Sequence, residues 1–453
     1  MNFGDRRIRL TLAILPLVAC ASDKKRPALP EVQYELDSPV ASAAPSAAPV
    51  ASSAPVLPAQ PPAAPPPKEC DDVAMAETLG HLGNNLGDEL VKSNYNGNVL
   101  VSPVSVAYAL DLAGLGAKGD TLATLERVAF AENCGVVQLA KRLADFQHAL
   151  LTTTADKALP GFAGGNSVFQ VANGVWGDRG VTIQPEYGSL VKELLSAEVM
   201  RVPFAQTPED ARRTINSWVG DHTQQKILEL LPSGAVNKST KLVLTNALYF
   251  KGAWEHPFSA GQTSIQPFFF SDGRKVGVST MTETETVLYV EKPDGQQVVE
   301  LPYKGISLVM RIHLPPKDVP FADFKTATDV GPSGTLEHVA VKLSLPKFKF
   351  GQRYALSGPL KTMGLAALFS EGADFSGITG GKDFVIGEVF HGTFIDVDER
   401  GTEAGAATGV VMRATAAVRP KEMKVNRPFV VSIVDRKTSA VIFTGRVADP
   451  TKR

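Results

Sequence analysis

Apolar residues recur at helical spacing in the first half of residues 70–453 and in strand-like runs in the second half. The helical spacing predicts helices over 71–92, 102–116, 121–130, 136–151, 185–196, 211–223, 227–231 and 356–365. The other runs predict strands over 98–101, 167–176, 242–250, 298–301, 308–314, 339–345, 384–397, 425–434 and 440–446. Helices followed by strands favour an α+β fold over a parallel alternating one.

Two local signals are sharper than the rest. Ser102 and Pro103 suit the N-cap and the first turn of a helix, where backbone amides lack partners within the helix. Residues 242–250 are apolar almost without interruption, which is typical of a strand that is buried on both faces. We therefore expect 242–250 to be a central strand.

The N-terminus has the pattern of an export signal. Arg6, Arg7 and Arg9 precede an apolar run, 10–18, that is too short to span a bilayer as a mature anchor. The run ends in Leu-Val-Ala-Cys, which resembles the cleavage box of bacterial lipoproteins and implies a signal peptide over 1–19 and a lipid on Cys20. The alternative is an ordinary secretory signal cut near residue 19. Ala rather than Asp at position 21 favours the outer membrane or cell surface.

Residues 20–69 read as a tether, because they are rich in Ala, Pro and Ser and carry no charge between 38 and 67. The rest, 70–453, has no further low-complexity break and is expected to fold as one domain.

The chain has 46 basic and 47 acidic residues, so nothing in its charge suggests a nucleic-acid partner. Cys70 and Cys134 remain after Cys20, and an exported chain can pair them or leave them free.

Motifs of the common hydrolases are missing from the sequence. It contains no Gly-x-Ser-x-Gly, no His-Glu-x-x-His and no cysteine spacing typical of zinc sites, and its seven histidines are scattered. We therefore expect no catalytic residues, no metal and no cofactor, and a protein that is not an enzyme.

A run of small residues near the C-terminus has the alternation that a new strand in a sheet would need. Thr402, Ala404, Ala406 and Thr408 fall on one face, and Glu403 falls on the other, because strand side chains alternate. No proline interrupts the run. The alternative is a flexible Ala/Gly surface loop. The candidate segment as a whole comprises Glu399, Gly401, Thr402, Glu403, Ala404, Gly405, Ala406, Ala407 and Thr408.

Several blocks, in the same order, resemble the serpin family over about 71–453. They are 98–105, 110–117, 244–254, 300–305, 345–348, 373–378, 426–429 and 443–447. The resemblance implies a serpin fold with three β-sheets, about nine helices and an exposed reactive-centre loop, in which the small-residue run is the hinge. It also implies a metastable native state, because the main sheet can accept one more strand.

The resemblance implies an irreversible suicide inhibitor of serine endopeptidases, with cysteine endopeptidases as an alternative class. Counting from the hinge places the reactive bond at Thr415–Ala416, which suits elastase- or subtilisin-like proteases with small binding pockets. Arg413–Ala414 is the alternative for a trypsin-like protease, and a bond one or two residues after Thr415 is a further one. The rival function is a non-inhibitory serpin that acts as a binding or scaffold protein. We expect a monomer.

The family's gating positions also carry over. Ser102, Ser105, Asn246 and His391 match the polar shutter beneath the main sheet, although His391 alone reads as an ordinary strand histidine. Trp254 matches the aromatic residue at the breach, where insertion starts. Glu399 is expected to pair with Lys347, and an exposed pair of this kind contributes only about 0–1 kcal/mol.

Overall fold

The computed structural model describes residues 69–93, 97–155, 168–321, 336–382, 384–402 and 419–452, all within the compact unit Pro65–Arg453. The predicted signal peptide and nearly all of the predicted tether, with Cys20, lie outside the described residues, as do 403–418. No helix in the described part of the chain combines the length and the apolar character needed to cross a membrane.

Six of the helices come early in the chain, as the helical spacing predicted. They are α1 (Asp72–Ser93), α2 (Pro103–Gly114), α3 (Gly119–Val128), α4 (Val136–Ala155), α5 (Pro185–Leu195) and α6 (Pro208–His222). Ser102 caps α2 through a bond from the Ser105 amide to its hydroxyl, and Pro103 occupies the first turn. The later helices are short: η1 (Ala260–Gln262), α7 (Ser357–Leu360), η3 (Lys361–Leu365), η4 (Ala366–Phe369) and α8 (Ser376–Thr379).

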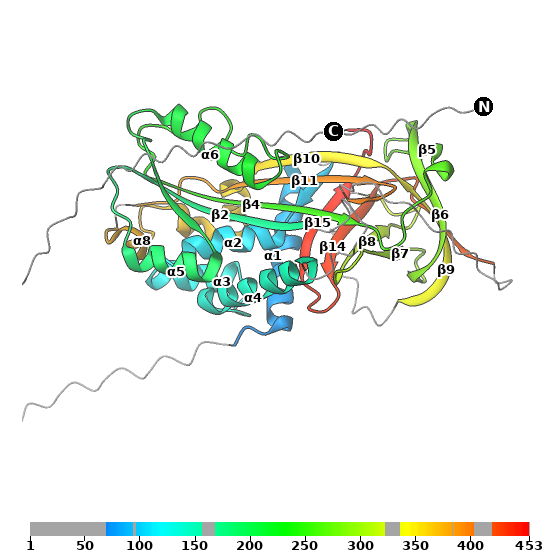
Figure 1. The fold of residues 1–453 in the computed structure, drawn as a ribbon, viewed down its shortest axis with the longest axis horizontal. Helices are drawn as coiled ribbons and strands as arrows, with labels where there is room; N and C mark the ends of the chain where they lie inside the picture. Colours follow the sequence, from blue (N-terminus) through cyan, green and yellow to red (C-terminus); the bar gives the residue numbers. More distant parts are fainter. Residues whose placement is uncertain are drawn as a thin grey trace, which may run out of the picture. The chain divides into compact units, whose positions relative to one another are not determined.

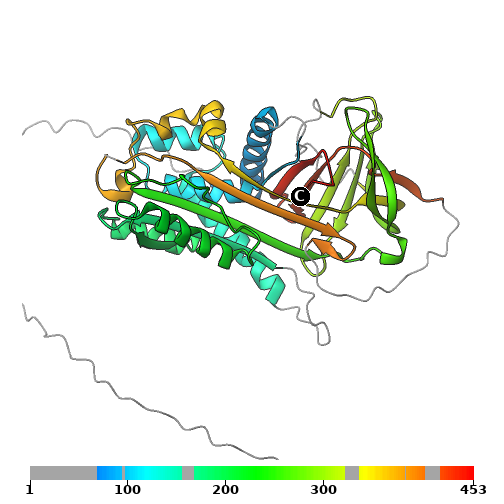
Figure 2. The same ribbon diagram turned by 90° about the horizontal axis from the view of Figure 1, so that it is seen from above.

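The main sheet has six strands and lies between helices on both faces (Figures 1 and 2). Its order is β10 (Phe348–Ala355), β11 (Phe390–Asp398), β12 (Gly401–Thr402), β4 (Leu242–Ala253), β2 (Val168–Asp178) and β3 (Glu198–Val202). Helix α6 packs on one face through an apolar cluster that includes Ile215, Val219, Trp176 and Val243. Helix α2 lies on the other face, within the largest core cluster. The strand predicted from 242–250 is central and almost wholly buried, as expected.

A second sheet of nine strands adjoins the main one. Its order is β1 (Val99–Val101), β15 (Val441–Val447), β14 (Phe429–Asp435), β8 (Leu308–Leu314), β7 (Gln297–Pro302), β6 (Lys275–Glu291), β9 (Glu337–Pro346) and β13 (Lys421–Lys424), with β5 (Ser264–Phe269) paired to β6. The described strands thus form two hydrogen-bonded sheets rather than three. The reason is the long β6, which pairs with β5 and β9 along one part and with β7 at its end, and so joins two groups of strands.

The prediction of a helix over 227–231 is wrong. Gln224 and Gln225 have positive φ angles of 51° and 59°, which end the helical path after α6. The backbone of Leu231 then bonds to the side chain of Asn216 in both directions, at 2.9 Å each, instead of to a helical neighbour. The segment is held as a series of turns.

Two predicted strands begin later than expected. Strand β11 starts at Phe390 rather than at 384, because its partner β10 ends at Ala355, opposite Phe390, and the chain continues there into α7. Strand β14 starts at Phe429 rather than at 425, because Pro428 has no N–H to donate to a ladder. The helix expected over 356–365 is regular only at Ser357–Leu360, since Gly364, with φ of 103°, interrupts it.

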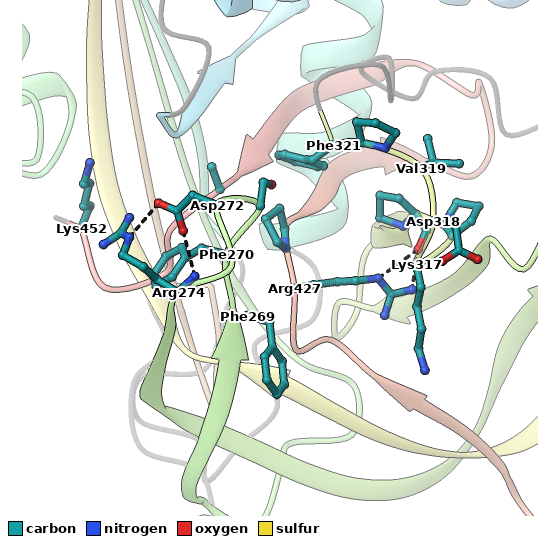
Figure 3. A pocket seen from close by; sticks show the side chains of 16 residues that line it. Phe269, Phe270, Asp272, Arg274, Lys317, Asp318, Val319, Phe321, Arg427 and Lys452 are labelled. Atoms are coloured by element: carbon teal, nitrogen blue, oxygen red, sulfur yellow. Dashed lines mark hydrogen bonds and ion pairs between the residues drawn. The ribbon is translucent and has the colours of Figure 1, made fainter.

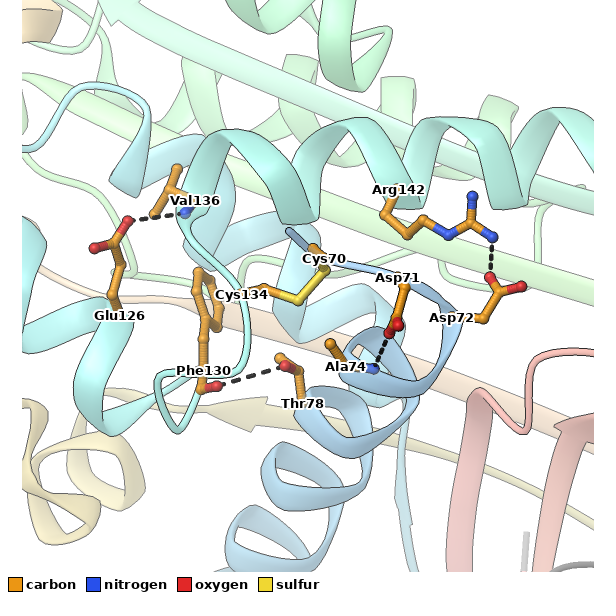
Figure 4. Close-up of a disulfide and its surroundings, with 10 residues drawn as sticks. All are labelled: Cys70, Asp71, Asp72, Ala74, Thr78, Glu126, Phe130, Cys134, Val136 and Arg142. Carbon is orange, nitrogen blue, oxygen red and sulfur yellow. Dashed lines mark hydrogen bonds and ion pairs between the residues drawn. A yellow bond between two sulfur atoms is a disulfide. The ribbon is translucent and has the colours of Figure 1, made fainter. Parts of the chain in front are cut away.

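Cys70 and Cys134 form a disulfide that fixes the start of α1 to the turn before α4 (Figure 4). Their Cα atoms are 5.0 Å apart although 64 residues separate them in sequence. Arg142 on α4 pairs with Asp72 on α1 beside the bond, and the Thr78 hydroxyl donates to the Phe130 carbonyl at 3.4 Å. The N-terminal end of α1 is therefore fastened covalently as well as by packing.

Candidate functional site

The main sheet divides between β4 and β11. Residues 390–392 of β11 pair directly, in parallel, with 245–247 of β4. Toward the other end of the two strands, β12 lies between them and is antiparallel to both (Figure 2). Between these regions, 393–396 and 248–251 have no partner strand on their facing edges among the described residues. The sheet is thus closed at one end and occupied by a third strand at the other.

The two strands keep one register along this length. Phe390 pairs with Thr245, an offset of 145 residues. Across β12, Thr402 lies opposite both Val397 and Gly252, and 397 − 252 is again 145. An antiparallel strand could therefore extend from β12 without any sliding of β4 against β11.

Strand β12 is held closely at its start. Gly401 has φ of 150°, and a Cβ atom there would lie 2.1 Å from the Gly252 carbonyl oxygen, so only glycine fits. Thr402 is buried, and its hydroxyl lies 2.7 Å from the Tyr303 hydroxyl. Tyr303 in turn stacks on Trp254 with a centroid distance of 4.8 Å. The beginning of the predicted hinge is therefore a buried strand rather than a surface loop.

Trp254 and Glu399 hold the turn between β11 and β12. The Trp254 indole N–H donates to the Asp398 carbonyl at 3.0 Å, and its backbone N–H donates to the Arg400 carbonyl at 2.9 Å. Glu399 accepts from Lys347 at 2.7 Å and from Thr263 at 2.8 Å. Partial burial acts to raise the pKa of Glu399, but these two hydrogen bonds help to lower it.

The Glu399–Lys347 pair is less exposed than the sequence suggested. The Glu399 side chain is only 15% exposed, against 36% for Lys347. Because the largely buried carboxylate also accepts from Thr263, the pair is held in one geometry and fixes the direction in which the chain leaves β11.

Ser102, Ser105, Asn246 and His391 meet beneath the closed end of the sheet. The Ser102 amide donates to His391 Nε2 at 3.1 Å, and Ser105 Oγ lies 3.3 Å from His391 Nδ1. Ser105 also donates to the Asn246 side-chain oxygen, and the Asn246 amide donates to Asn173 at 2.6 Å. All five residues are buried and bonded to one another.

These bonds define the protonation of His391. Because Nε2 accepts from an amide, it carries no proton, so in a neutral ring Nδ1 donates to Ser105. Burial lowers the pKa of His391 from 6.5 to about 3, which agrees with a neutral ring. The shutter is therefore a fully bonded, uncharged network that joins α2, β2, β4 and β11.

Comparison with known proteins gives a consistent result. Residues 77–450 match the serpin (serine protease inhibitor) family. The chain belongs to the serpin family. It is 34% identical over 372 residues to a leukocyte elastase inhibitor of Bos taurus, which covers 80% of this chain and 95% of that protein. It is 33% identical over 393 residues to a serpin-like protein of Thermococcus kodakarensis, which covers 84% of this chain and 87% of that protein.

Solved structures agree on the fold. Native protease nexin-1 with heparin aligns with a TM-score of 0.70 at 27% identity, over 84% of this chain and 100% of that one. The cleaved Serpin 42Da aligns with the same TM-score at 26% identity, over 84% of this chain and 98% of that one. The serpin fold and its relation to serine protease inhibitors are thus established for this chain, and the expected α+β class is confirmed.

The structure brings together the predicted residues that it describes, in two groups at opposite ends of the gap. One comprises Ser102, Ser105, Asn246 and His391, and the other comprises Trp254, Lys347, Glu399, Gly401 and Thr402. The rest of the predicted hinge, 403–408, and all four candidates for the reactive bond, Arg413, Ala414, Thr415 and Ala416, lie outside the described residues.

Sequence reasoning missed three members of these groups: Asn173, Tyr303 and Thr263. Asn173 is the only polar side chain in an otherwise apolar stretch at 171–176, which could have suggested a buried partner for Asn246. Tyr303 lies within a block that carried the family resemblance, but nothing in its spacing indicates the stacking on Trp254. Thr263 follows no pattern that we recognise.

Acidification should weaken this serpin through His391. Its native pKa, about 3, lies below the ordinary value, so the unfolded chain binds a proton that the native state does not. Its contribution to stability is present above about pH 6.5 and is lost at about 1.4 kcal/mol per pH unit below that. We expect the urea midpoint to fall between pH 6.5 and 5, and to fall less in His391→Gln. His338→Gln, at an exposed position, is the control; an unchanged slope in His391→Gln would contradict the assignment.

Proposed function

We propose that this serpin inhibits serine endopeptidases irreversibly, by inserting its cleaved reactive loop into the main sheet while the protease is still bound as an acyl-enzyme. One observation carries the proposal: the chain that leads into the loop is already a two-residue strand between β4 and β11, and these strands keep the register needed to accept more. The small residues on one face of 402–408 favour this function over that of a non-inhibitory serpin, because bulky or charged residues on that face, or proline, would hinder insertion.

Extension of β12 in this register gives each hinge residue a definite position. Thr402 lies opposite Val397 of β11 and Gly252 of β4. Because β12 is antiparallel to both strands, each residue further along β12 lies opposite a residue one position earlier on β11 and on β4. Residue 404 would lie between Ile395 and Phe250, and residue 406 between Thr393 and Leu248. All four of these neighbours are buried. Directly opposite residues share a face of a sheet, so the small even-numbered hinge residues would point into the core.

Insertion beyond residue 406 requires the shutter to part. Residues 407–409 would lie between 390–392 and 245–247, which now pair directly. Thr408 would then stand between His391 and Asn246, where its hydroxyl can replace bonds that the separation breaks. The bonded, neutral shutter therefore opposes spontaneous insertion, and cleavage of the loop supplies the free strand that overcomes it.

The trap acts on the protease through geometry. A serine protease attacks the loop as a substrate and forms an acyl-enzyme with the residue before the cut. About twelve inserted residues at ~3.3 Å each would carry the captured protease some 40 Å. Deacylation then fails if the protease is distorted, because a misplacement of about 1 Å can cost about 10²-fold in rate. The inhibitor itself contributes no catalytic group.

The favoured reactive bond is Thr415–Ala416, with elastase- or subtilisin-like proteases as targets, and two of the relatives are named leukocyte elastase inhibitors. Arg413–Ala414 would instead suit a trypsin-like protease.

We also propose that the protein is exported and held at a bacterial membrane, as a monomer, by a lipid on Cys20 and the tether that follows. The disulfide that fastens residue 70 supports this, since it fixes the point at which a tether would pull.

The proposal predicts a covalent complex. The full chain with Cys20→Ser, which removes the lipid site, would be mixed with elastase-, subtilisin- and trypsin-type proteases. We expect a complex that survives SDS and the release of a peptide beginning at Ala416, identified by mass spectrometry. Release of a peptide beginning at Ala414 would move the target to the trypsin-like class. Cleavage with no complex and no gain in heat resistance would leave a non-inhibitory serpin.

A further inference from the structure

A pocket of about 770 Å³ lies beside the second sheet (Figure 3), and none of its lining residues belongs to the hinge or the shutter. One wall is the hairpin that joins β5 to β6, from Phe269 to Arg274, and the opposite wall is the loop after β8, 315–321. Arg427 and Pro428, just before β14, form its floor, and Lys452 near the C-terminus lies at its edge. A volume of this size suits a small organic molecule, since such pockets measure about 300–1,000 Å³.

Much of the apolar part of the lining is held in place by its own contacts. It consists of the rings of Phe269, Phe270 and Phe321 and of four prolines, at 315, 316, 320 and 428. Arg446 stacks over Phe321 with its guanidinium carbon 4.1 Å from the ring centroid and also donates to the Phe321 carbonyl. The amide of Phe269 donates to the Asn426 carbonyl at 2.8 Å, which ties the hairpin to the floor. Prolines and fixed rings lose little freedom when a ligand binds.

The charged part of the lining is predominantly positive. Four cations, Arg274, Lys317, Arg427 and Lys452, line the pocket against the carboxylates of Asp272 and Asp318, an excess of two positive charges. Asp272 is already paired with Arg274 at 2.7 Å. An anion that entered the pocket would therefore meet more unneutralised cations than carboxylates.

Arg427 is the most enclosed of these cations. Its side chain extends toward the 315–321 loop (Figure 3), and its Nε donates to the Pro315 carbonyl at 3.2 Å. No carboxylate among the described residues forms an ion pair with it. Burial lowers the pKa of its guanidinium because the charge is partly removed from water. A bound anion would compensate that loss of hydration.

We propose that this pocket binds a small amphiphilic anion: a carboxylate attached to an aromatic body, with the ring against Phe269 and Phe321 and the carboxylate toward Arg427, Lys317 and Lys452. The lining requires both halves of such a ligand. A purely apolar molecule would leave the cations unmatched, and a simple inorganic anion would leave the rings and prolines uncovered.

Calorimetric titration with naphthoate tests the proposal, using the full chain with Cys20→Ser and the neutral naphthalene methanol as the comparison ligand. We expect one saturable site for naphthoate and binding by the alcohol that is at least about tenfold weaker, which is a difference of about 1.4 kcal/mol. Absence of saturable naphthoate binding at millimolar concentration, or equal binding of the two compounds, would overturn the assignment.

A charge-reversed variant locates the site. Lys317→Glu with Lys452→Glu changes two exposed side chains of the lining, and we expect naphthoate affinity to fall at least about tenfold. Lys141→Glu with Lys192→Glu, at exposed positions on α4 and α5, has the same net charge and should bind as the parent does. Unchanged affinity in the first variant would place any binding elsewhere and refute the site. Protease inhibition is not a readout here, so the outcome is independent of the proposed function.

Discussion

Ala404→Arg should convert this serpin from an inhibitor into an ordinary substrate of its target protease, whereas Glu403→Arg should leave inhibition nearly intact. In the register of β12, residue 404 would enter the sheet between Ile395 and Phe250, both buried, and would face the core. Residue 403 would enter between Asp396 and Lys251, which are partly exposed, and would face outward. The same side chain is therefore tested on the two faces of one strand.

The expected effect is large because an unpaired charge in an apolar site costs several kcal/mol. Each ~1.4 kcal/mol added to the barrier for insertion slows that step about tenfold, so deacylation overtakes it. The measurement is the number of inhibitor molecules cleaved per protease molecule trapped, which should rise at least about tenfold for Ala404→Arg. Equal values for the two variants would show that the alternation of faces does not govern the loop, and would remove the register argument.

The order of helices and strands was predictable because it depends on short-range patterns. The unbroken apolar run at 242–250 became the central strand β4, and Ser102 with Pro103 began α2. The pairing of β4 with both β11 and β12 was not predictable in this way. That arrangement joins residues about 145 positions apart, and periodicity carries no information about such distances.

The errors occurred where local features interrupt a pattern that continues in the sequence. Ile227, Leu230 and Leu231 have helical spacing, but Asn216 holds the Leu231 backbone, so the segment turns instead. Strand β11 begins late because its partner β10 ends at Ala355, where the chain continues into α7. Strands β5 and β6 were overlooked because Thr and Glu alternate over 282–286, which leaves no apolar face to indicate a half-buried strand there.

The candidate site came from the family resemblance more than from the residues themselves. The four shutter residues are spread over 290 positions, and nothing in their individual surroundings predicts that they meet. The structure adds the chemistry, since the amide-bonded Nε2 of His391 and the Asn246–Asn173 bond define an uncharged network. The resemblance gave the positions, but not which atom donates or how deeply each group is buried.

Asp111→Asn should stabilise the native protein at pH 8 more than at pH 5. Asp111 lies on α2, is fully buried, and neither of its carboxylate oxygens has a hydrogen-bond partner in the described structure. Burial, with a smaller contribution from Glu126, raises the pKa of this carboxyl well above its ordinary value. Tyr108, one turn earlier, is the other titratable group close to it, and its hydroxyl donates to the Leu143 carbonyl at 3.0 Å rather than to Asp111.

The sign follows from the proton balance. The native state keeps the Asp111 proton at pH values where the unfolded chain has released it. The contribution of Asp111 to the free energy of unfolding is therefore fully present below about pH 4. It is lost as the pH rises toward the native pKa, at about 1.4 kcal/mol per pH unit. Asparagine has the same shape and cannot ionise, so the difference between the urea midpoints of the variant and the parent should widen from pH 5 to pH 8. Asp120→Asn, at an exposed position on α3, removes one negative charge without touching the core and should show no such widening.

A constant difference for Asp111→Asn would mean that a partner neutralises this carboxyl in the native protein. A widening difference would show that the proton on the buried Asp111 carboxyl contributes to the stability of the native state. Asp111 lies on α2, the same helix that carries the shutter residue Ser105 beneath β4.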